Sequence, residues 1–176
     1  MNLANKLTIF RIVLVPFFLL FLLTDFTPYN KLIALIIFII ATITDHFDGK
    51  IARKRNMVSS FGKFMDPIAD KLLVSSAIIS LTSLEIIPAW VTIAIICREF
   101  IISGVRLVAS DNGSVIAASS WGKAKTITQM AMIIIFLLDH PALYVLSQIV
   151  MYASVILTII SLVDYLIKNK DAIKFE

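Results

Sequence analysis

The chain has 176 residues, of which 59% are hydrophobic and only 16% are charged, and its mean hydropathy is +0.93. This composition excludes an ordinary soluble domain. The net charge is +4, but a chain without a soluble domain offers no basic surface on which nucleic acid could bind. We therefore expect a single membrane domain over residues 1–176. The one cysteine, Cys97, lies in an apolar run, and we expect it to be buried in packing.

Six apolar stretches are each long enough, or nearly so, to span a bilayer as a helix. In chain order they cover residues 8–23, 30–53, 62–83, 88–108, 120–138 and 142–167. Turn-forming residues, including Pro28, Pro88, Gly113 and Pro141, mark the breaks between them. Residues 1–7 are predicted to be a short interfacial segment. The pattern predicts an all-α integral membrane protein with six transmembrane helices.

Basic residues indicate the orientation of these helices. Of the 16 Lys and Arg residues, all except Lys31 fall at the two termini, around the 54–61 and 109–119 loops, or on the helix ends that face them. Cytoplasmic loops of membrane proteins carry such an excess of basic residues. We therefore expect a multi-pass protein of the plasma or inner membrane, with both termini in the cytoplasm and contacts to anionic lipids.

Four aspartates occur within 26 residues at the predicted cytoplasmic ends of the second and third spans. Asp45 and Asp48 are three residues apart, and Asp66 and Asp70 are four apart, so each pair shares a helix face. Carboxylates at a membrane are costly unless they are compensated, and an all-oxygen cluster suits Mg²⁺ or Mn²⁺. We predict a site for one or two of these ions. In the alternative, the aspartates pair with their basic neighbours, which are Lys50, Arg53, Lys63 and Lys71.

Small residues surround the four aspartates. Gly49, Ala52 and Gly62 leave room either for a neighbouring helix or for a flat ligand such as a nucleotide. Arg53 stands one helical turn beyond Gly49, where we expect its guanidinium to bind phosphate oxygens; the alternative is that it anchors the helix at the cytoplasmic surface.

The fixed residues of this region form the pattern D-x2-D-G-x2-A-R-x8-G-x3-D-x3-D. It resembles the signature of the CDP-alcohol phosphotransferase family, with every fixed position filled. The resemblance implies a six-helix membrane enzyme, generally homodimeric, that transfers the phosphatidyl group of CDP-diacylglycerol to an alcohol and releases CMP. It also implies a role in metal binding for the four aspartates and a role as base for Asp70. The residues expected to bind CDP-diacylglycerol are Asp48, Gly49, Ala52, Arg53 and Gly62.

A second region, from Cys97-Arg-Glu-Phe100 to Trp121-Gly-Lys-Ala-Lys-Thr126, resembles the bacterial phosphatidylglycerophosphate synthases within that family. The acceptor implied is sn-glycerol 3-phosphate. The residues expected to bind its phosphate are Arg106, Lys123, Lys125, Arg98, Thr8 and Arg11. Glu99 lies seven residues before Arg106 on the same helix face, and we expect it to orient or neutralise that guanidinium.

Two alternatives remain at the level of sequence. Another member of the family could use a different acceptor, such as inositol phosphate, since basic residues alone do not distinguish the two phosphates. In a different class, intramembrane carboxylates also occur in ion transporters, and a divalent-cation transporter would explain the aspartates. The clustering of all four at one membrane face favours the enzyme, because a conduction path needs polar groups along its whole length.

Overall fold

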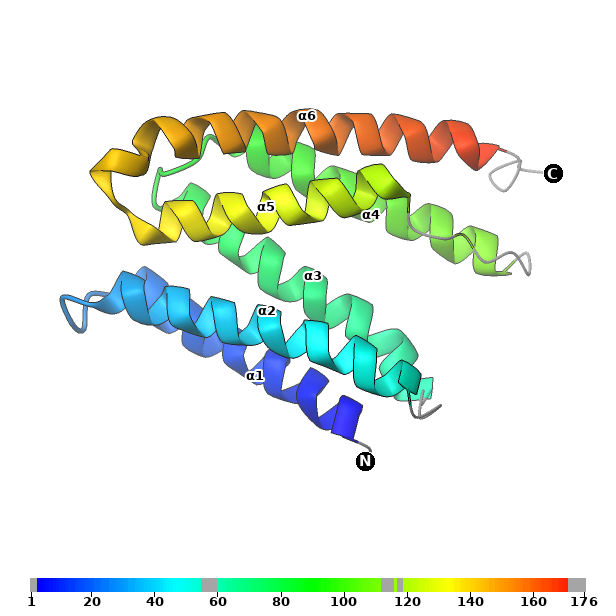
Figure 1. Ribbon diagram of the computed structural model, residues 1–176, viewed down its shortest axis with the longest axis horizontal. Helices are drawn as coiled ribbons and strands as arrows, with labels where there is room; N and C mark the ends of the chain where they lie inside the picture. The colour runs from blue at the N-terminus through cyan, green and yellow to red at the C-terminus, as the bar shows by residue number, and fades with distance from the viewer. Residues whose placement is uncertain (1–2, 55–59, 112–115, 117–118, 171–176) are drawn as a thin grey trace. The chain divides into compact units, whose positions relative to one another are not determined.

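The computed structural model describes residues 3–54, 60–111, 116 and 119–170 of the chain. Within these ranges it leaves out the side chains of residues 3–4, 45–54, 60–64, 66–67, 70 and 111. The described residues form helices and no strand, which confirms the predicted all-α fold (Figure 1). The elements are α1 (Leu3–Leu23), α2 (Asn30–Lys54), α3 (Ser60–Ser83), α4 (Ala89–Asp111), α5 (Ser120–Leu138), the 3-10 helix η1 (Pro141–Leu143) and α6 (Tyr144–Lys168).

Each predicted span corresponds to one α-helix, with small shifts at the ends. The largest shift is at α1, which begins at Leu3 rather than at residue 8. Ala4, Lys6 and Leu7 are all good helix formers, so nothing in the N-terminal segment interrupts the helix. The interfacial position of these residues stays a prediction.

Three stretches of the described chain are long and apolar enough to cross a membrane by length and composition. They are Asn5–Leu23, Ser120–Leu138 and Pro141–Lys168. The apolar parts described for α2 and α3 are shorter, Asn30–Thr44 and Lys71–Ser83. The helix α4 is not among these stretches, and it carries Arg98, Glu99 and Arg106 within its length.

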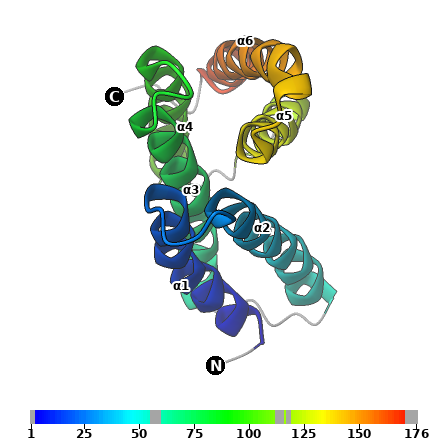
Figure 2. The ribbon, with the colours of Figure 1, turned by 90° about the vertical axis from the view of Figure 1, so that its left-hand side faces the viewer.

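The chain divides into two compact units. The first comprises Met1–Ile86 with Phe136–Asp139, and the second comprises Ile87–Ile135 with His140–Glu176. In the first unit, α1 packs against both α2 and α3 (Figure 2). The rings of Phe18 on α1 and Phe38 on α2 lie 5.9 Å apart between centroids, and both are fully buried. Aromatic contacts of this kind hold the α1–α2 hairpin in register.

Two turns of the first unit are held by local hydrogen bonds. Asn30 at the start of α2 is buried, and its side-chain oxygen accepts hydrogen bonds from the N–H and the hydroxyl of Thr27, at 3.0 and 2.8 Å. At the end of α3, Glu85 has a φ of 58°, and the N–H of Ile86 donates to the carbonyl of Leu81. This is a Schellman ending, in which Glu85 holds the left-handed position that glycine usually takes.

An ion pair in the first unit bears on the predicted topology. Nζ of Lys31, at the start of α2, lies 2.5 Å from a carboxylate oxygen of Asp139, which follows α5. The pair joins the 24–29 turn to the turn after α5. In a six-span arrangement both turns belong to the same side of the membrane, so this contact agrees with the predicted order of spans. Lys31 was the one basic residue that did not fit the cytoplasmic pattern.

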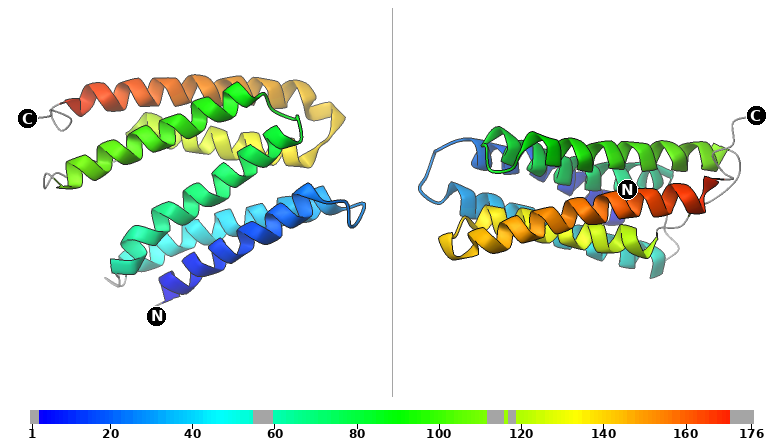
Figure 3. Two further views of the ribbon diagram at one scale, coloured as in Figure 1. Left: turned by 180° about the vertical axis from the view of Figure 1, so that it is seen from behind. Right: turned by 90° about the horizontal axis from the view of Figure 1, so that it is seen from above.

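In the second unit, α4 and α6 run side by side (Figure 3). The buried face of α6 is made largely of small and hydroxyl-bearing residues: Ser147, Met151, Ser154, Val155, Thr158, Ser161 and Tyr165. Small side chains let two helix backbones approach closely, which favours helix association in a membrane, where the hydrophobic effect does not drive helices together. The polar α4 and the hydroxyl-bearing α6 are thus partners.

Cys97 corrects one expectation from sequence. It is a free cysteine on the exposed surface of α4 rather than a buried packing residue. Its helix turns the opposite face inward, where Ile95 and Ile102 are buried. Trp90 and Trp121 are about half exposed near the starts of α4 and α5, as expected of residues at a membrane interface.

Candidate functional site

The predicted metal site lies on the helical backbones of α2 and α3. Asp45 and Asp48 fall within α2, and Asp66 and Asp70 within α3, so the helical spacing expected for each pair is confirmed. The side chains of Asp45, Asp48 and Asp66 lie outside the described residues, as does that of Asp70. The same holds for the predicted nucleotide-binding residues Gly49, Ala52, Arg53 and Gly62. Their convergence on a metal and a nucleotide stays a prediction.

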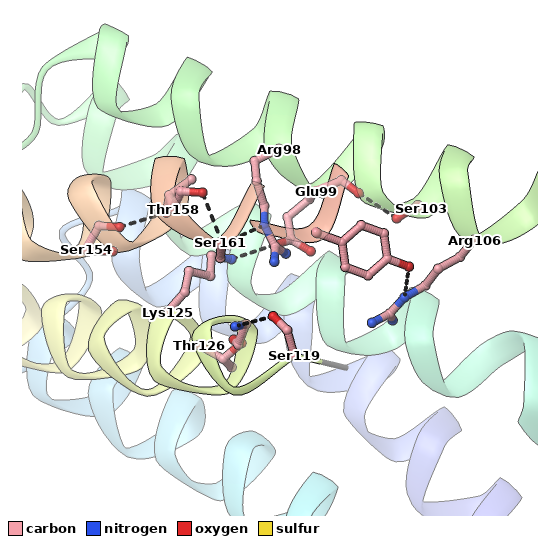
Figure 4. Close-up of polar contacts among 12 residues, drawn as sticks. Arg98, Glu99, Ser103, Arg106, Ser119, Lys125, Thr126, Ser154, Thr158 and Ser161 are labelled. Carbon is pink, nitrogen blue, oxygen red and sulfur yellow. Dashed lines mark hydrogen bonds and ion pairs between the residues drawn. The ribbon is translucent and has the colours of Figure 1, made fainter. Parts of the chain in front are cut away.

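The second unit contains a cluster of charged side chains, Arg98 and Glu99 from α4 and Lys125 from α5, which we call the α4–α5 ion cluster (Figure 4). Oε1 of Glu99 accepts hydrogen bonds from both cations. It lies 2.9 Å from NH1 of Arg98 and 2.5 Å from Nζ of Lys125. The sequence placed both cations in one group of phosphate-binding residues, and the structure brings them together.

The charged side chains of this cluster are largely buried, so water screens their interactions only weakly. The side chains of Arg98 and Lys125 are only 10% and 3% exposed, and that of Glu99 is 21% exposed. The carboxylate of Glu99 carries one negative charge, whereas Arg98 and Lys125 together carry two positive charges. Counting these three side chains alone, the cluster keeps one excess positive charge in a poorly solvated place. Such a site attracts an anion.

The start of α5 adds to this positive character. Ser119 caps the helix, because its hydroxyl accepts the N–H of Gly122 at 3.1 Å. No acidic residue lies in the first turn, whereas Lys123 and Lys125 both lie near the start. Cations at the positive end of a helix dipole are unfavourable by themselves, and helix N-termini are common anion sites. Lys123 is exposed, so its ammonium is accessible to a ligand.

Arg98 reaches this same helix start. A Cβ placed on Gly122 would lie 3.5 Å from NH2 of Arg98, so this terminal nitrogen lies against the first turn of α5. Nε of the same guanidinium donates to the hydroxyl of Ser161 on α6 at 3.2 Å. Three helices therefore fix one arginine side chain.

Arg106 has a different partner from the one that its spacing predicts. The expected pairing with Glu99 is wrong, because Glu99 binds Arg98 and Lys125 instead. Nε of Arg106 donates to the hydroxyl of Tyr165 at 3.2 Å, and the guanidinium carbon lies 5.7 Å from the centre of that ring. Sharing a helix face was not enough to pair Glu99 with Arg106, since neighbouring helices offer closer partners to both.

Thr8 and Arg11 belong to the other unit. Together with Asn5 they form a buried polar face of α1, with residues spaced three apart. Thr8 and Arg11 therefore share one face of α1. Their role in binding the acceptor stays a prediction.

Sequence reasoning missed Ser161 and Tyr165, which hold the two arginines of α4. A signal for them exists in the sequence. Most of α6 is apolar, but hydroxyl residues recur on one face at positions 147, 154, 158, 161 and 165. Polar residues at regular helical spacing in a membrane span indicate a face turned toward protein rather than lipid.

Comparison with known proteins identifies the family of the chain. The family model for CDP-alcohol phosphatidyltransferase matches residues 1–160. The chain belongs to the CDP-alcohol phosphatidyltransferase family. This is the family that the aspartate motif predicted, and it removes the support for a cation transporter.

Individual relatives cover nearly the whole chain. A Bacillus subtilis protein named CDP-diacylglycerol–glycerol-3-phosphate 3-phosphatidyltransferase is 41% identical over 98% of this chain and 97% of its own length. A Rickettsia bellii protein of the same name is 37% identical over 93% of both chains. A Mycobacterium tuberculosis protein named "Probable phosphatidylglycerophosphate synthase" is 45% identical over 93% of this chain and 79% of its own.

Replacement of Glu99 by glutamine should destabilise the protein, because it removes the carboxylate that accepts hydrogen bonds from the buried Arg98 and Lys125. Loss of one partner of a buried ion pair typically costs about 3–5 kcal/mol. We expect a clear decrease in the free energy of unfolding, measured by SDS titration of dodecylmaltoside micelles.

The exposed pair Lys31–Asp139, with side chains 48% and 58% exposed, offers the matched control. Lys31→Met should change stability by less than about 1 kcal/mol. Adding Lys125→Met to Glu99→Gln should restore part of the lost stability, because it removes one of the two cations that Glu99 binds. Equal small effects for Glu99→Gln and Lys31→Met would contradict the structural role of the cluster.

Proposed function

We propose that this chain transfers the phosphatidyl group of CDP-diacylglycerol to sn-glycerol 3-phosphate, giving phosphatidylglycerophosphate and CMP in phospholipid biosynthesis. The α4–α5 ion cluster is the observation that carries the choice of acceptor. It gathers two cations from two helices around one carboxylate within a membrane chain, and cations held together in this way can bind the phosphate of an acceptor. The names of the relatives that cover the chain support the same acceptor.

A divalent cation, Mg²⁺ or Mn²⁺, fits the donor set of the aspartate motif. Asp45, Asp48, Asp66 and Asp70 offer only carboxylate oxygens, which hard cations prefer. Each pair is three or four residues apart within one continuous helix, the spacing at which two residues share a helix face. These four residues would hold one or two ions, and a bound ion would neutralise the pyrophosphate and stabilise departing CMP.

The remaining residues of the motif bind and activate the substrates. Arg53 donates hydrogen bonds to the pyrophosphate oxygens, and the small residues Gly49, Ala52 and Gly62 leave space for the cytidine. Asp70 accepts the proton of the acceptor hydroxyl as that oxygen attacks the phosphorus on the diacylglycerol side. The bond from that phosphorus to the oxygen of CMP breaks, and CMP leaves.

The acceptor phosphate is bound by cations of the second unit. Arg98 and Lys125 are already oriented by Glu99, and Arg106 is oriented by Tyr165. Lys123 is exposed at the start of α5, next to the positive end of that helix. Thr8 and Arg11 of α1 complete the proposed set. Arginine suits this task because its planar fork can bind two phosphate oxygens at once.

The placement of the reaction follows from the charge pattern. Basic residues at both termini and in the 54–61 and 109–119 loops put these parts in the cytoplasm. The aspartate motif flanks the first of these loops, so the active site faces the cytoplasm of the cell membrane, where glycerol 3-phosphate is dissolved. The acyl chains stay among the membrane lipids, and the enzyme acts as a homodimer.

An acceptor panel tests the proposed substrate. With radiolabelled CDP-diacylglycerol and purified protein in detergent, glycerol 3-phosphate should yield labelled phosphatidylglycerophosphate. Glycerol, which lacks the phosphate, should be at least ~100-fold poorer in kcat/KM, because two charge-assisted hydrogen bonds are worth about 1.5–3 kcal/mol each. Inositol phosphate, serine and phosphatidylglycerophosphate complete the panel, and preference for any of them over glycerol 3-phosphate would overturn the proposed acceptor.

Metal dependence is tested by chelation. Dialysis against EDTA should abolish transfer, and Mg²⁺ or Mn²⁺ should restore it, because the four carboxylates need a cation to hold a pyrophosphate. Metal binding itself can be followed by the paramagnetic resonance signal of Mn²⁺. The variant Asp45→Asn with Asp66→Asn should no longer bind Mn²⁺, whereas Asp25→Asn, which changes an aspartate in the 24–29 turn, should bind it like the wild type. Full activity in EDTA would remove the metal from the proposal.

Asp70→Asn separates the base from the binding residues. The amide keeps the shape of the side chain but cannot accept a proton, so kcat should fall by roughly 100-fold or more. Binding of CDP-diacylglycerol, measured by filtration with the labelled lipid in Mg²⁺, should change by much less. Turnover equal to that of the wild type would remove Asp70 from the role of base.

A further inference from the structure

The two arginines of α4 are held by α6 in the same way. In each of them Nε donates to a hydroxyl group on α6, from Arg98 to Ser161 and from Arg106 to Tyr165, both at 3.2 Å. Ser161 and Tyr165 are one helical turn apart on the buried face of α6. The helix that closes the described chain therefore presents a row of acceptors to the guanidinium groups of α4.

The contact of Arg106 with Tyr165 is the more informative of the two. Tyr165 is only 2% exposed, so its ring and hydroxyl are fixed by packing. Arg106 itself is exposed. It meets Tyr165 in two ways, through the hydrogen bond from Nε and through the ring, which lies 5.7 Å from the guanidinium carbon. An exposed arginine is thus attached to a rigid support.

Tyr165 binds Arg106 through Nε of the guanidinium and not through its two terminal nitrogens. Nε is bound by Tyr165, whereas NH1 and NH2 are the nitrogens that bind two oxygens of a phosphate side by side. A free arginine side chain loses rotamer entropy when a ligand fixes it. A side chain that is already fixed in the unbound protein loses less, and the ligand binds more tightly.

We propose that Tyr165 is a positioning residue that holds Arg106 ready for the phosphate of the acceptor. This inference rests on the proposed function, because it assigns Arg106 to that phosphate. Tyr165 does not touch the substrate in this scheme. It acts on acceptor binding through Arg106, so its loss weakens binding of glycerol 3-phosphate without slowing the chemical step.

Steady-state kinetics of Tyr165→Phe test the proposal. This variant keeps the ring and removes the hydroxyl. The KM for glycerol 3-phosphate should rise roughly 3- to 10-fold, the usual effect of one hydrogen bond, while kcat and the KM for CDP-diacylglycerol stay within about two-fold of the wild type. Tyr152→Phe is the matched control. It lies on the same helix, its ring contacts Trp90, and it is exposed, so its kinetics should equal those of the wild type.

A double-mutant cycle shows whether Tyr165 acts through Arg106. In the Arg106→Met background, Tyr165→Phe should leave the already raised KM for glycerol 3-phosphate unchanged, because there is no guanidinium left to position. Arg106→Lys offers a variant that leaves α6 intact. It keeps the charge but lacks Nε, and it should raise the same KM by a comparable factor.

The outcomes separate this inference from the proposed function. A wild-type protein that makes no product from glycerol 3-phosphate overturns the proposed function and this inference with it. An active wild type whose KM is unaffected by Tyr165→Phe overturns only the role of Tyr165. So does an effect of Tyr165→Phe that is equally large in the Arg106→Met background, since the tyrosine then acts by another route.

Discussion

The carboxylate of Glu99 is the interaction on which the second unit depends. It receives hydrogen bonds from Arg98 on its own helix and from Lys125 on α5. Without it, the two buried cations would lose the carboxylate that they share, and loss of one partner of a buried ion pair costs several kcal/mol. With it, α4 and α5 are joined at a fixed point, and the cluster still carries more positive than negative charge. The same residue therefore stabilises the fold and leaves the site attractive to an anion.

Hydroxyl groups on α6 complete the support of the basic residues. Thr158 and Ser161 each donate to a backbone carbonyl of their own helix, at 2.7 and 3.0 Å. A hydroxyl group that donates in this way can still accept, and Ser161 accepts from Arg98. Polar atoms inside a membrane protein must find such partners, because lipid supplies none. The face of α6 that packs on α4 is thus both small enough for close approach and polar enough to hold arginine.

The helices were predictable because the membrane imposes one length and one kind of secondary structure on a spanning segment. All six predicted spans correspond to observed helices. The extension of α1 to Leu3 follows from the helix propensity of its first residues rather than from their packing. The aspartate motif could be read because its chemistry depends on local spacing within single helices. The partner of Arg106 and the exposure of Cys97 could not be read, because both depend on which face of α4 turns toward α6.

The sequence by itself determined the all-α membrane architecture and, through the aspartate motif, the family. It did so because apolar length and short-range spacing are written along the chain. Only the tertiary structure decided that Glu99 joins Arg98 to Lys125, and that Tyr165 rather than Glu99 holds Arg106. These contacts connect residues 26 and 59 positions apart as well as immediate neighbours. A side chain chooses among such partners by how the helices pack, and no local pattern encodes that choice.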